Sequence, residues 1–261
     1  MKVFAAFLAL VIISCTPMQP AFSGGSMNES LAVKGRMGIL INQKLSFGPY
    51  ATSRVQRSWT RTDKASMPLR TNVLFWMLYD KTLSLESTGK LQNLHFTMKS
   101  PQGSKADVYA TSVFSSEEIL ASGNPNSGIN VLNRMFGAGS SENVYYLQVY
   151  LGNREKPWHL MLDNQASQTQ AKSYRGVFAL DEERYYTLIP VTKVASKGGP
   201  KSILMGSVGY EIKDARGNTV AGVSLIDQGQ VFFNTPDPEE KFLLANLAAA
   251  LLLQENLEAQ S

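Results

Sequence analysis

Near the end of the chain, the stretch 242–253 is apolar at every position except Asn246. A helix formed by this stretch would be hydrophobic all round, and such a helix must be buried all round. Its roughly 12 residues, at about 1.5 Å rise each, span about 18 Å, whereas a membrane-spanning helix needs roughly 20 apolar residues. A second membrane anchor is the alternative interpretation. The favoured one requires a fold that encloses a short helix completely.

The residues before this stretch predict where the helix begins. Asp237 can accept hydrogen bonds from the first helical N–H groups, and Pro238 suits the first position of a helix. Glu239 and Glu240 place negative charge at the positive end of the helix dipole. We predict a C-terminal core helix over 238–254, with a polar start that suits an aqueous fold rather than a bilayer.

Most of the chain before the helix alternates between apolar and polar residues, which is the pattern of half-buried strands. Pro190 interrupts one of these stretches, which favours an edge or a bend there. The predicted strands are 33–41, 91–98, 144–151, 158–162, 185–194, 203–212, 219–226 and 230–233. A chain of 261 residues can form one large β domain or two small ones. We predict a single, mainly β domain over 31–261, an antiparallel barrel or strongly curved sheets packed around the hydrophobic C-terminal helix.

The last three predicted strands form a meander that leads directly into the apolar helix. This order, over about 202–253, resembles the tubby-like barrel group, which includes the phospholipid scramblases. In that group a closed β barrel surrounds one hydrophobic helix near the end of the chain. The resemblance is architectural, because no signature residue matches and no phosphoinositide-binding basic residues carry over. A lipocalin-like barrel with an outer helix, or a β-sandwich with a packed helix, also fits the pattern.

The first residues have the form of an export signal. Lys2 precedes an apolar run about half as long as a membrane span needs, and small residues and prolines end it. At its end, Ile12-Ile13-Ser14-Cys15 resembles the lipobox of bacterial lipoproteins, although the family more often has leucine where Ile12 stands. The resemblance implies a signal peptide over 1–14, cleavage after Ser14 and lipidation of Cys15. The alternatives are a buried helix of the folded domain and a coincidental cysteine.

The lipobox resemblance implies a membrane-anchored protein of the bacterial cell envelope. The resemblance implies an anchor of three acyl chains on Cys15. Two or more acyl chains hold a protein stably on a membrane. Thr16, rather than an aspartate, follows the cysteine, which favours the outer membrane over the inner one. Residues 15–30 have the composition of a flexible tether. Because Cys15 is the only cysteine, no disulfide can form, and the domain must be stabilised by its core.

The charge of the chain predicts no nucleic-acid partner. The formal net charge is +4, and it falls to +3 once Lys2 is removed with the signal peptide. The basic residues are scattered along the chain and form no run. Binding of nucleic acid requires clustered Lys and Arg side chains. A weak attraction to anionic lipid is the most that the charge implies.

No motif predicts catalysis, a metal or a cofactor. His95 and His159 lie in separate stretches of the chain beside bulky residues, and two distant histidines without a usable cysteine do not make a typical zinc site. We interpret both as structural. The segment Gly137-Ala138-Gly139 lacks the third glycine and the preceding strand of a dinucleotide loop, so it indicates a turn.

One acidic run could supply paired carboxylates for glycoside chemistry. It is Asp181-Glu182-Glu183, followed by Arg184. Consecutive acids of both kinds next to an arginine are more typical of a solvated turn. We therefore expect the protein not to be an enzyme.

Aromatic residues are plentiful, and in a barrel about half of them face the core. The outward ones can form a recognition surface. The residues concerned are Trp59, Trp76, Trp158, Tyr145, Tyr146, Tyr185 and Tyr186. Three hypotheses follow, in order of preference: a non-enzymatic envelope module that binds a protein or glycan, a binder of lipid or another apolar ligand, and an enzyme with dispersed acids. A core filled by the helix favours the first.

Overall fold

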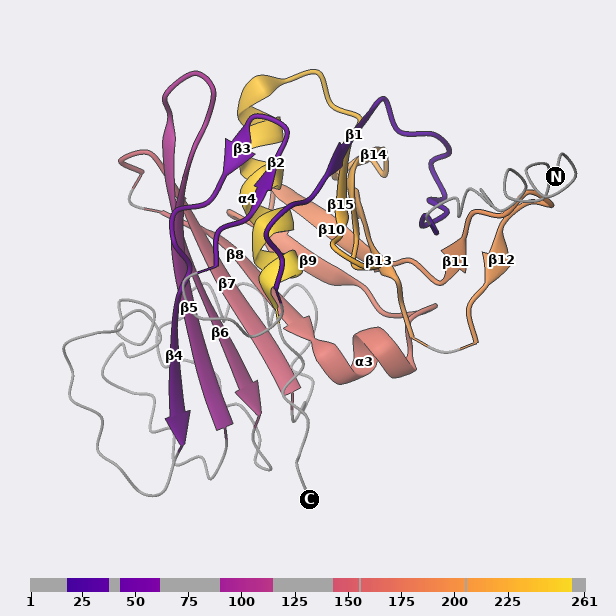
Figure 1. Ribbon diagram of the computed structural model, residues 1–261, viewed down its shortest axis with the longest axis horizontal. Coiled ribbons are helices and arrows are strands. Elements are labelled where there is room, and N and C mark those ends of the chain that lie inside the picture. The colour runs from indigo at the N-terminus through magenta and orange to yellow at the C-terminus, as the bar shows by residue number, and fades with distance from the viewer. Residues whose placement is uncertain are drawn as a thin grey trace, which may run out of the picture.

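The computed structural model describes residues 18–37, 43–61, 90–114, 143–154, 156–204 and 206–254. Eleven strands form one antiparallel sheet in the order β1-β15-β14-β13-β10-β9-β8-β7-β6-β5-β4 (Figure 1). Two short two-stranded sheets, β2-β3 and β11-β12, accompany it. The elements are β1 Glu29–Ala32, β2 Ser46–Phe47, β3 Tyr50–Ala51, β4 Gln56–Arg61, β5 Lys90–Lys99, β6 Lys105–Phe114, β7 Asn143–Leu151, β8 Trp158–Asp163, α3 Asn164–Thr169, β9 Gly176–Ala179, β10 Tyr185–Pro190, β11 Lys193–Val194, β12 Lys201–Ser202, β13 Gly209–Lys213, β14 Thr219–Ser224, β15 Gln230–Phe233 and α4 Pro238–Leu253.

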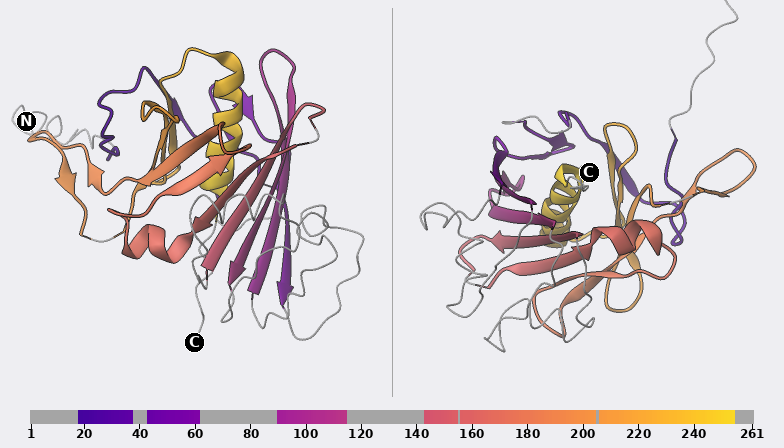
Figure 2. Two further views of the ribbon diagram at one scale, coloured as in Figure 1. Left: turned by 180° about the vertical axis from the view of Figure 1, so that it is seen from behind. Right: turned by 90° about the horizontal axis from the view of Figure 1, so that it is seen from below.

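The sheet curves around α4, which every view places inside its concave face (Figure 2). The helix contacts β6 and β7 as well as β14 and β15, which lie in different parts of the strand order. All twelve residues from Phe242 to Leu253 are buried. The predictions of a mainly β, antiparallel fold and of a C-terminal helix are therefore confirmed.

The start of α4 has the predicted cap. The side chain of Asp237 accepts a hydrogen bond from the N–H of Glu239 (3.1 Å), and Pro238 occupies the first turn. Within the core, Tyr145 of β7 donates its hydroxyl to the carbonyl oxygen of Ala250 (2.9 Å). Burial raises the pKa of Tyr145, so this hydroxyl keeps its proton and joins the sheet to the helix.

The segment 43–55 lies over α4 between β1 and β4 (Figure 1). Lys34 and Ser46 exchange backbone hydrogen bonds of 2.9 and 3.0 Å, so the chain after β1 pairs with β2. Tyr50 then stacks on Phe242 of the helix, with ring centroids 6.4 Å apart. Aromatic side chains thus cover the part of α4 that faces this segment.

Three predicted strands differ from the structure. The predicted strand 33–41 is wrong in its described part, because β1 ends at Ala32 and residues 33–37 form only an isolated bridge at Lys34, while 38–41 lie outside the described residues. The predicted strand 185–194 divides after Pro190 into β10 and β11, as a proline in a ladder allows. The predicted strand 203–212 is shorter, because β12 ends at Ser202 and β13 begins at Gly209. β11 and β12 pair with each other in a separate hairpin instead of extending the main sheet.

Candidate functional site

The described chain begins at Met18, so the predicted processing residues Ile12, Ile13, Ser14 and Cys15 lie outside the described residues. Met18 is the third residue after the cysteine. The path of the chain from Met18 onward therefore determines where a lipid anchor would join the domain.

Residues 18–28, which we call the N-terminal segment, begin beside the β11-β12 hairpin. Pro20 pairs with Val194 in an antiparallel bridge. The N–H of Ala21 donates to the carbonyl oxygen of Lys193 (2.9 Å). The N-terminal segment thus lies against β11 as a short third strand of the hairpin.

Phe22 fixes the next part of the N-terminal segment on the main sheet. Its ring meets Phe232 of β15 edge-on, with centroids 5.0 Å apart and an interplanar angle of 70°. Gly222 of the neighbouring β14 leaves room for this ring, since a Cβ atom there would lie 2.5 Å from it. The absence of a side chain at position 222 therefore lets the Phe22 ring pack directly against β14.

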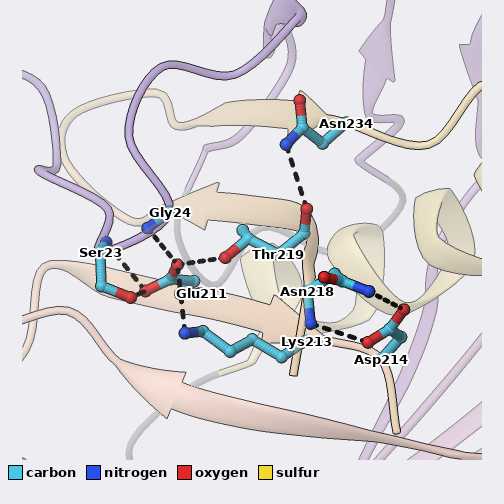
Figure 3. A network of polar contacts seen from close by, with 8 residues as sticks. All are labelled: Ser23, Gly24, Glu211, Lys213, Asp214, Asn218, Thr219 and Asn234. Carbon is cyan, nitrogen blue, oxygen red and sulfur yellow. Dashed lines mark hydrogen bonds and ion pairs between the residues drawn. The ribbon is translucent and has the colours of Figure 1, made fainter. Parts of the chain in front are cut away.

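The carboxylate of Glu211 on β13 accepts four hydrogen bonds, three from the N-terminal segment and one from Thr219 of β14 (Figure 3). Both neighbours of Glu211 on β13 belong to the core, so its side chain projects from the outer face, yet it is only 3% exposed. Oε2 accepts from the N–H (3.0 Å) and the hydroxyl (2.7 Å) of Ser23. Oε1 accepts from the N–H of Gly24 (2.9 Å) and the hydroxyl of Thr219 (2.5 Å). Lys213 places its Nζ 4.0 Å from the same oxygen.

This environment keeps Glu211 ionised. Burial by itself would raise its pKa, but the hydrogen bonds from Thr219, Ser23 and Gly24 together hold the pKa below its ordinary value. The close approach also depends on Gly24, because a Cβ atom there would lie 2.4 Å from Oγ1 of Thr219. Glu211 is thus a buried anion that accepts hydrogen bonds from the backbone N–H groups of Ser23 and Gly24.

The sequence predicts a flexible tether over 15–30, whereas in the structure this part of the chain pairs with β11 at Pro20, hydrogen-bonds to Glu211 at Ser23 and joins the main sheet from Glu29. Only the first three residues of the predicted tether lie outside the described chain. The small residues that have the composition of a linker are the ones whose backbone reaches Glu211. β1 then begins at Glu29 and pairs with β15.

We expect Glu211→Gln to release the N-terminal segment. Each carboxylate oxygen accepts one hydrogen bond from a hydroxyl and one from a backbone N–H. A hydroxyl can rotate and become an acceptor, whereas a backbone N–H can only donate. In either orientation, the glutamine NH₂ opposes a backbone N–H, and an unsatisfied donor costs about 1–3 kcal/mol. Amide hydrogen exchange at Ser23 and Gly24 should therefore accelerate by roughly 5- to 100-fold.

Glu183→Gln makes the same chemical change on an exposed turn and should leave these exchange rates unchanged. Acid should mimic Glu211→Gln. The pKa of Glu211 is lowered in the folded state. Its contribution to the stability of the docked segment is therefore complete above the ordinary pKa of 4.5, and it is lost as the pH falls through the folded-state pKa. Equal exchange in Glu211→Gln and the wild type at neutral pH would contradict the role assigned to this carboxylate.

The two histidines lie on the outer face of the main sheet, and strand register places them in one row. His95 pairs with Tyr109, Tyr109 with Gln148, and Gln148 with His159. The row continues through Ala179 to Tyr185. We call this set the outer-face row, and its residues are His95, Tyr109, Gln148, His159, Ala179 and Tyr185.

His159 belongs to a chain of hydrogen bonds. Gln148 donates from Nε2 to the hydroxyl oxygen of Tyr146 (3.2 Å), and this hydroxyl lies 2.6 Å from Nδ1 of His159. Burial lowers the pKa of His159 to about 4, so the ring is neutral at neutral pH and can accept the hydrogen of Tyr146. Burial raises the pKa of Tyr146, which therefore keeps its proton.

His95 has different partners. Its ring stacks on Tyr109, with centroids 4.5 Å apart, and its Nε2 lies 3.9 Å from Oδ1 of Asp107. Burial lowers the pKa of His95, although Asp107 opposes this shift. Three strand spacings of ~4.8 Å separate His95 from His159, roughly 14 Å in all, which is too far for both to bind one ion at ~2 Å. Among the described residues, no cluster of three or more His, Cys, Asp or Glu could hold a metal ion.

The acidic run lies between β9 and β10, with Glu182 and Glu183 exposed. Asp181 accepts hydrogen bonds from the N–H of Arg184 (2.8 Å) and from its Nε (2.9 Å). The side-chain hydrogen bond from Arg184 lowers the pKa of Asp181. Its carboxylate is thus engaged in closing the turn. The predicted turn at Gly137-Ala138-Gly139 lies outside the described residues.

The aromatic residues divide between the two faces of the sheet. Trp158 and Tyr145 belong to the core. Tyr186 packs against that core, with its ring centroid 5.5 Å from that of Trp158. Tyr146 and Tyr185 belong to a separate cluster with Val177, Ala179, Tyr109 and Met161. Trp76 and the side chain of Trp59 lie outside the described part of the chain.

No helix within the described ranges combines the length and the apolar character that a membrane span needs. Comparison of the chain with protein-family models, curated protein sequences and solved structures finds no significant match in any of the three.

Proposed function

We propose that this protein is a lipid-anchored module of the bacterial cell envelope that binds a partner and is not an enzyme. The observation that carries the proposal is the lipobox-like Ile12-Ile13-Ser14-Cys15, followed after two residues by a segment that docks on the domain. In this proposal the signal peptide 1–14 is removed, Cys15 carries the lipid, and the outer membrane is favoured over the inner one.

The docked N-terminal segment supports a fixed attachment of the domain to its anchor. The ring of Phe22 and the carboxylate of Glu211 hold this segment on the outer face of the sheet. A domain joined in this way would be held close to the bilayer rather than at the end of a long linker. Its position relative to the membrane would then be restricted.

The outer-face row supports binding of a protein or glycan. Tyr109 and Tyr185 are partly exposed, and so is Tyr150, whose ring lies 6.0 Å from that of Tyr109. Aromatic rings with a polar end suit interfaces, because they provide apolar area together with a hydrogen-bonding group.

A barrel of the tubby-like kind is the finer form of this fold that we propose. In support, residues 43–55 link the two ends of the strand order: Ser46 pairs with Lys34 after β1, and the N–H of Ser53 donates to the carbonyl oxygen of Thr97 in β5 (2.7 Å). In such a barrel α4 fills the interior. This favours a surface-bound partner over the alternative of an apolar ligand held inside.

Metabolic labelling tests the proposed anchor. Expressed in a bacterium with labelled palmitate, the wild-type chain should take up label and fractionate with membranes. Cys15→Ser removes the thiol that would carry the lipid and should take up none, whereas Thr16→Ser keeps that thiol and should be labelled like the wild type. An unlabelled wild type, or equal label in Cys15→Ser, would overturn the lipoprotein proposal.

A further inference from the structure

The β11-β12 hairpin stands apart from the main sheet, beside the N-terminal segment (Figures 1 and 2). It carries three exposed lysines, with Lys193 on β11, Lys197 in the turn and Lys201 on β12. Within a hairpin this short, all three positive charges lie on a small protrusion of the domain.

No carboxylate among the described residues neutralises the charge of this protrusion. The sequence contains no acidic residue from 184 to 210, nor from 15 to 28, so neither the hairpin nor the segment beside it has a carboxylate of its own. In the part of the chain that the structure describes, no acidic side chain forms an ion pair with Lys193, Lys197 or Lys201. The protrusion therefore presents a net positive surface to solvent.

The pairing direction places the start of the described chain at the turn of the hairpin. The N–H of Ala195 donates to the carbonyl oxygen of Gln19 (2.8 Å), while Ala21 pairs further back at Lys193. Followed toward its beginning, the chain thus runs toward the turn at 196–200. Met18, which is 56% exposed, is the described residue nearest to Cys15. Three residues span at most about 11 Å, so Cys15 must lie within that distance of Met18.

We propose that the β11-β12 hairpin binds the anionic phospholipid headgroups of the bilayer that holds the Cys15 lipid. This inference deepens the proposed function and rests on it for the orientation of the hairpin. The anchor would bring the lysines within the roughly 8 Å over which charges act in physiological salt. Each lysine near an anionic surface strengthens binding by about fivefold, so three together supply roughly 100-fold.

Vesicle sedimentation with the unlipidated mature chain, residues 15–261 with Cys15→Ser, tests the hairpin independently of lipidation. The chain should bind vesicles of equal phosphatidylcholine and phosphatidylglycerol but not vesicles of phosphatidylcholine alone. Binding should be lost in about 1 M salt, where the Debye length falls to ~3 Å. The triple variant Lys193→Gln, Lys197→Gln, Lys201→Gln should bind the anionic vesicles roughly 100-fold more weakly.

A matched control separates the hairpin from the overall charge. The triple variant Lys34→Gln, Lys99→Gln, Lys172→Gln removes the same charge from exposed positions elsewhere and should bind like the parent chain. Unchanged thermal melting of both variants would exclude unfolding as the cause. Equal loss of binding in both variants would overturn the hairpin assignment, and so would preference for an anionic polysaccharide with no binding to anionic vesicles. These outcomes are independent of palmitate labelling, so they can be distinguished from failure of the proposed anchor.

Discussion

Ala249→Lys should unfold the domain. Ala249 lies on α4 with 0% of its surface exposed, and the whole helix from Phe242 onward is buried. A lysine at this position has to bury its ammonium group or force the helix away from the sheet. Burial of an unpaired charge costs at least several kcal/mol, and an ordinary domain has only about 5–15 kcal/mol of stability. We expect the variant to lose its cooperative thermal transition in circular dichroism.

Ala32→Lys is the matched control, because Ala32 is an exposed alanine on β1. Its free energy of unfolding should change by no more than about 0.5 kcal/mol. Both variants are best made in the mature chain without lipid, which we expect to be soluble without detergent. If Ala249→Lys melted like the wild type, or if the unlipidated parent required detergent, the enclosed-helix interpretation would fail together with the tubby-like resemblance that depends on it.

The helix could be predicted from the sequence because its signals are local. The cap at Asp237 and the apolar run specify both its start and its burial, and the observed helix ends one residue before the predicted 254. Strands with regular alternation were predictable for the same reason, and the predicted strand at 230–233 agrees with β15.

The strand β6 shows where local patterns fail. Its inner positions are Ala106, Val108 and Ala110, and Asp107 lies between them. Alanine and aspartate have low strand propensity, so the segment is not among the predicted strands. It is a strand because β5 and β7 pair with it along almost its whole length. Only the assembled sheet supplies that stabilisation.

The candidate site depended on contacts that no local pattern contains. Ser23 and Glu211 are 188 residues apart in the sequence, and nothing near either residue predicts their hydrogen bonds. The outer-face row also requires register, since a shift of one residue between two strands would move a side chain to the other face. His95 and His159 therefore share a face for reasons that only the pairing of β5 to β8 reveals.

Register itself depends on a glycine whose role the sequence does not show. Gly209 begins β13 and pairs with Ser224 of β14. A Cβ atom at Gly209 would lie 2.0 Å from the carbonyl oxygen of Val223. That oxygen belongs to the backbone of the paired strand, so it cannot move aside as the end of a flexible side chain could. We expect Gly209→Ala to separate the start of β13 from β14 and to cost roughly 3 kcal/mol or more.

Two other glycines distinguish this steric conflict from general effects of glycine replacement. Gly198→Ala should be nearly neutral, because a Cβ atom there would meet no atom within 4 Å and the φ of Gly198 is not positive. Gly217 is equally open but has a φ of +85°, so Gly217→Ala should cost about 1–2 kcal/mol in backbone strain alone. Thermal melting should rank the variants in this order, with Gly209→Ala lowering Tm by roughly 6–12 °C. If Gly209→Ala were no worse than Gly217→Ala, β13 and β14 would not approach this closely, and the register that aligns Glu211 with the N-terminal segment would be wrong.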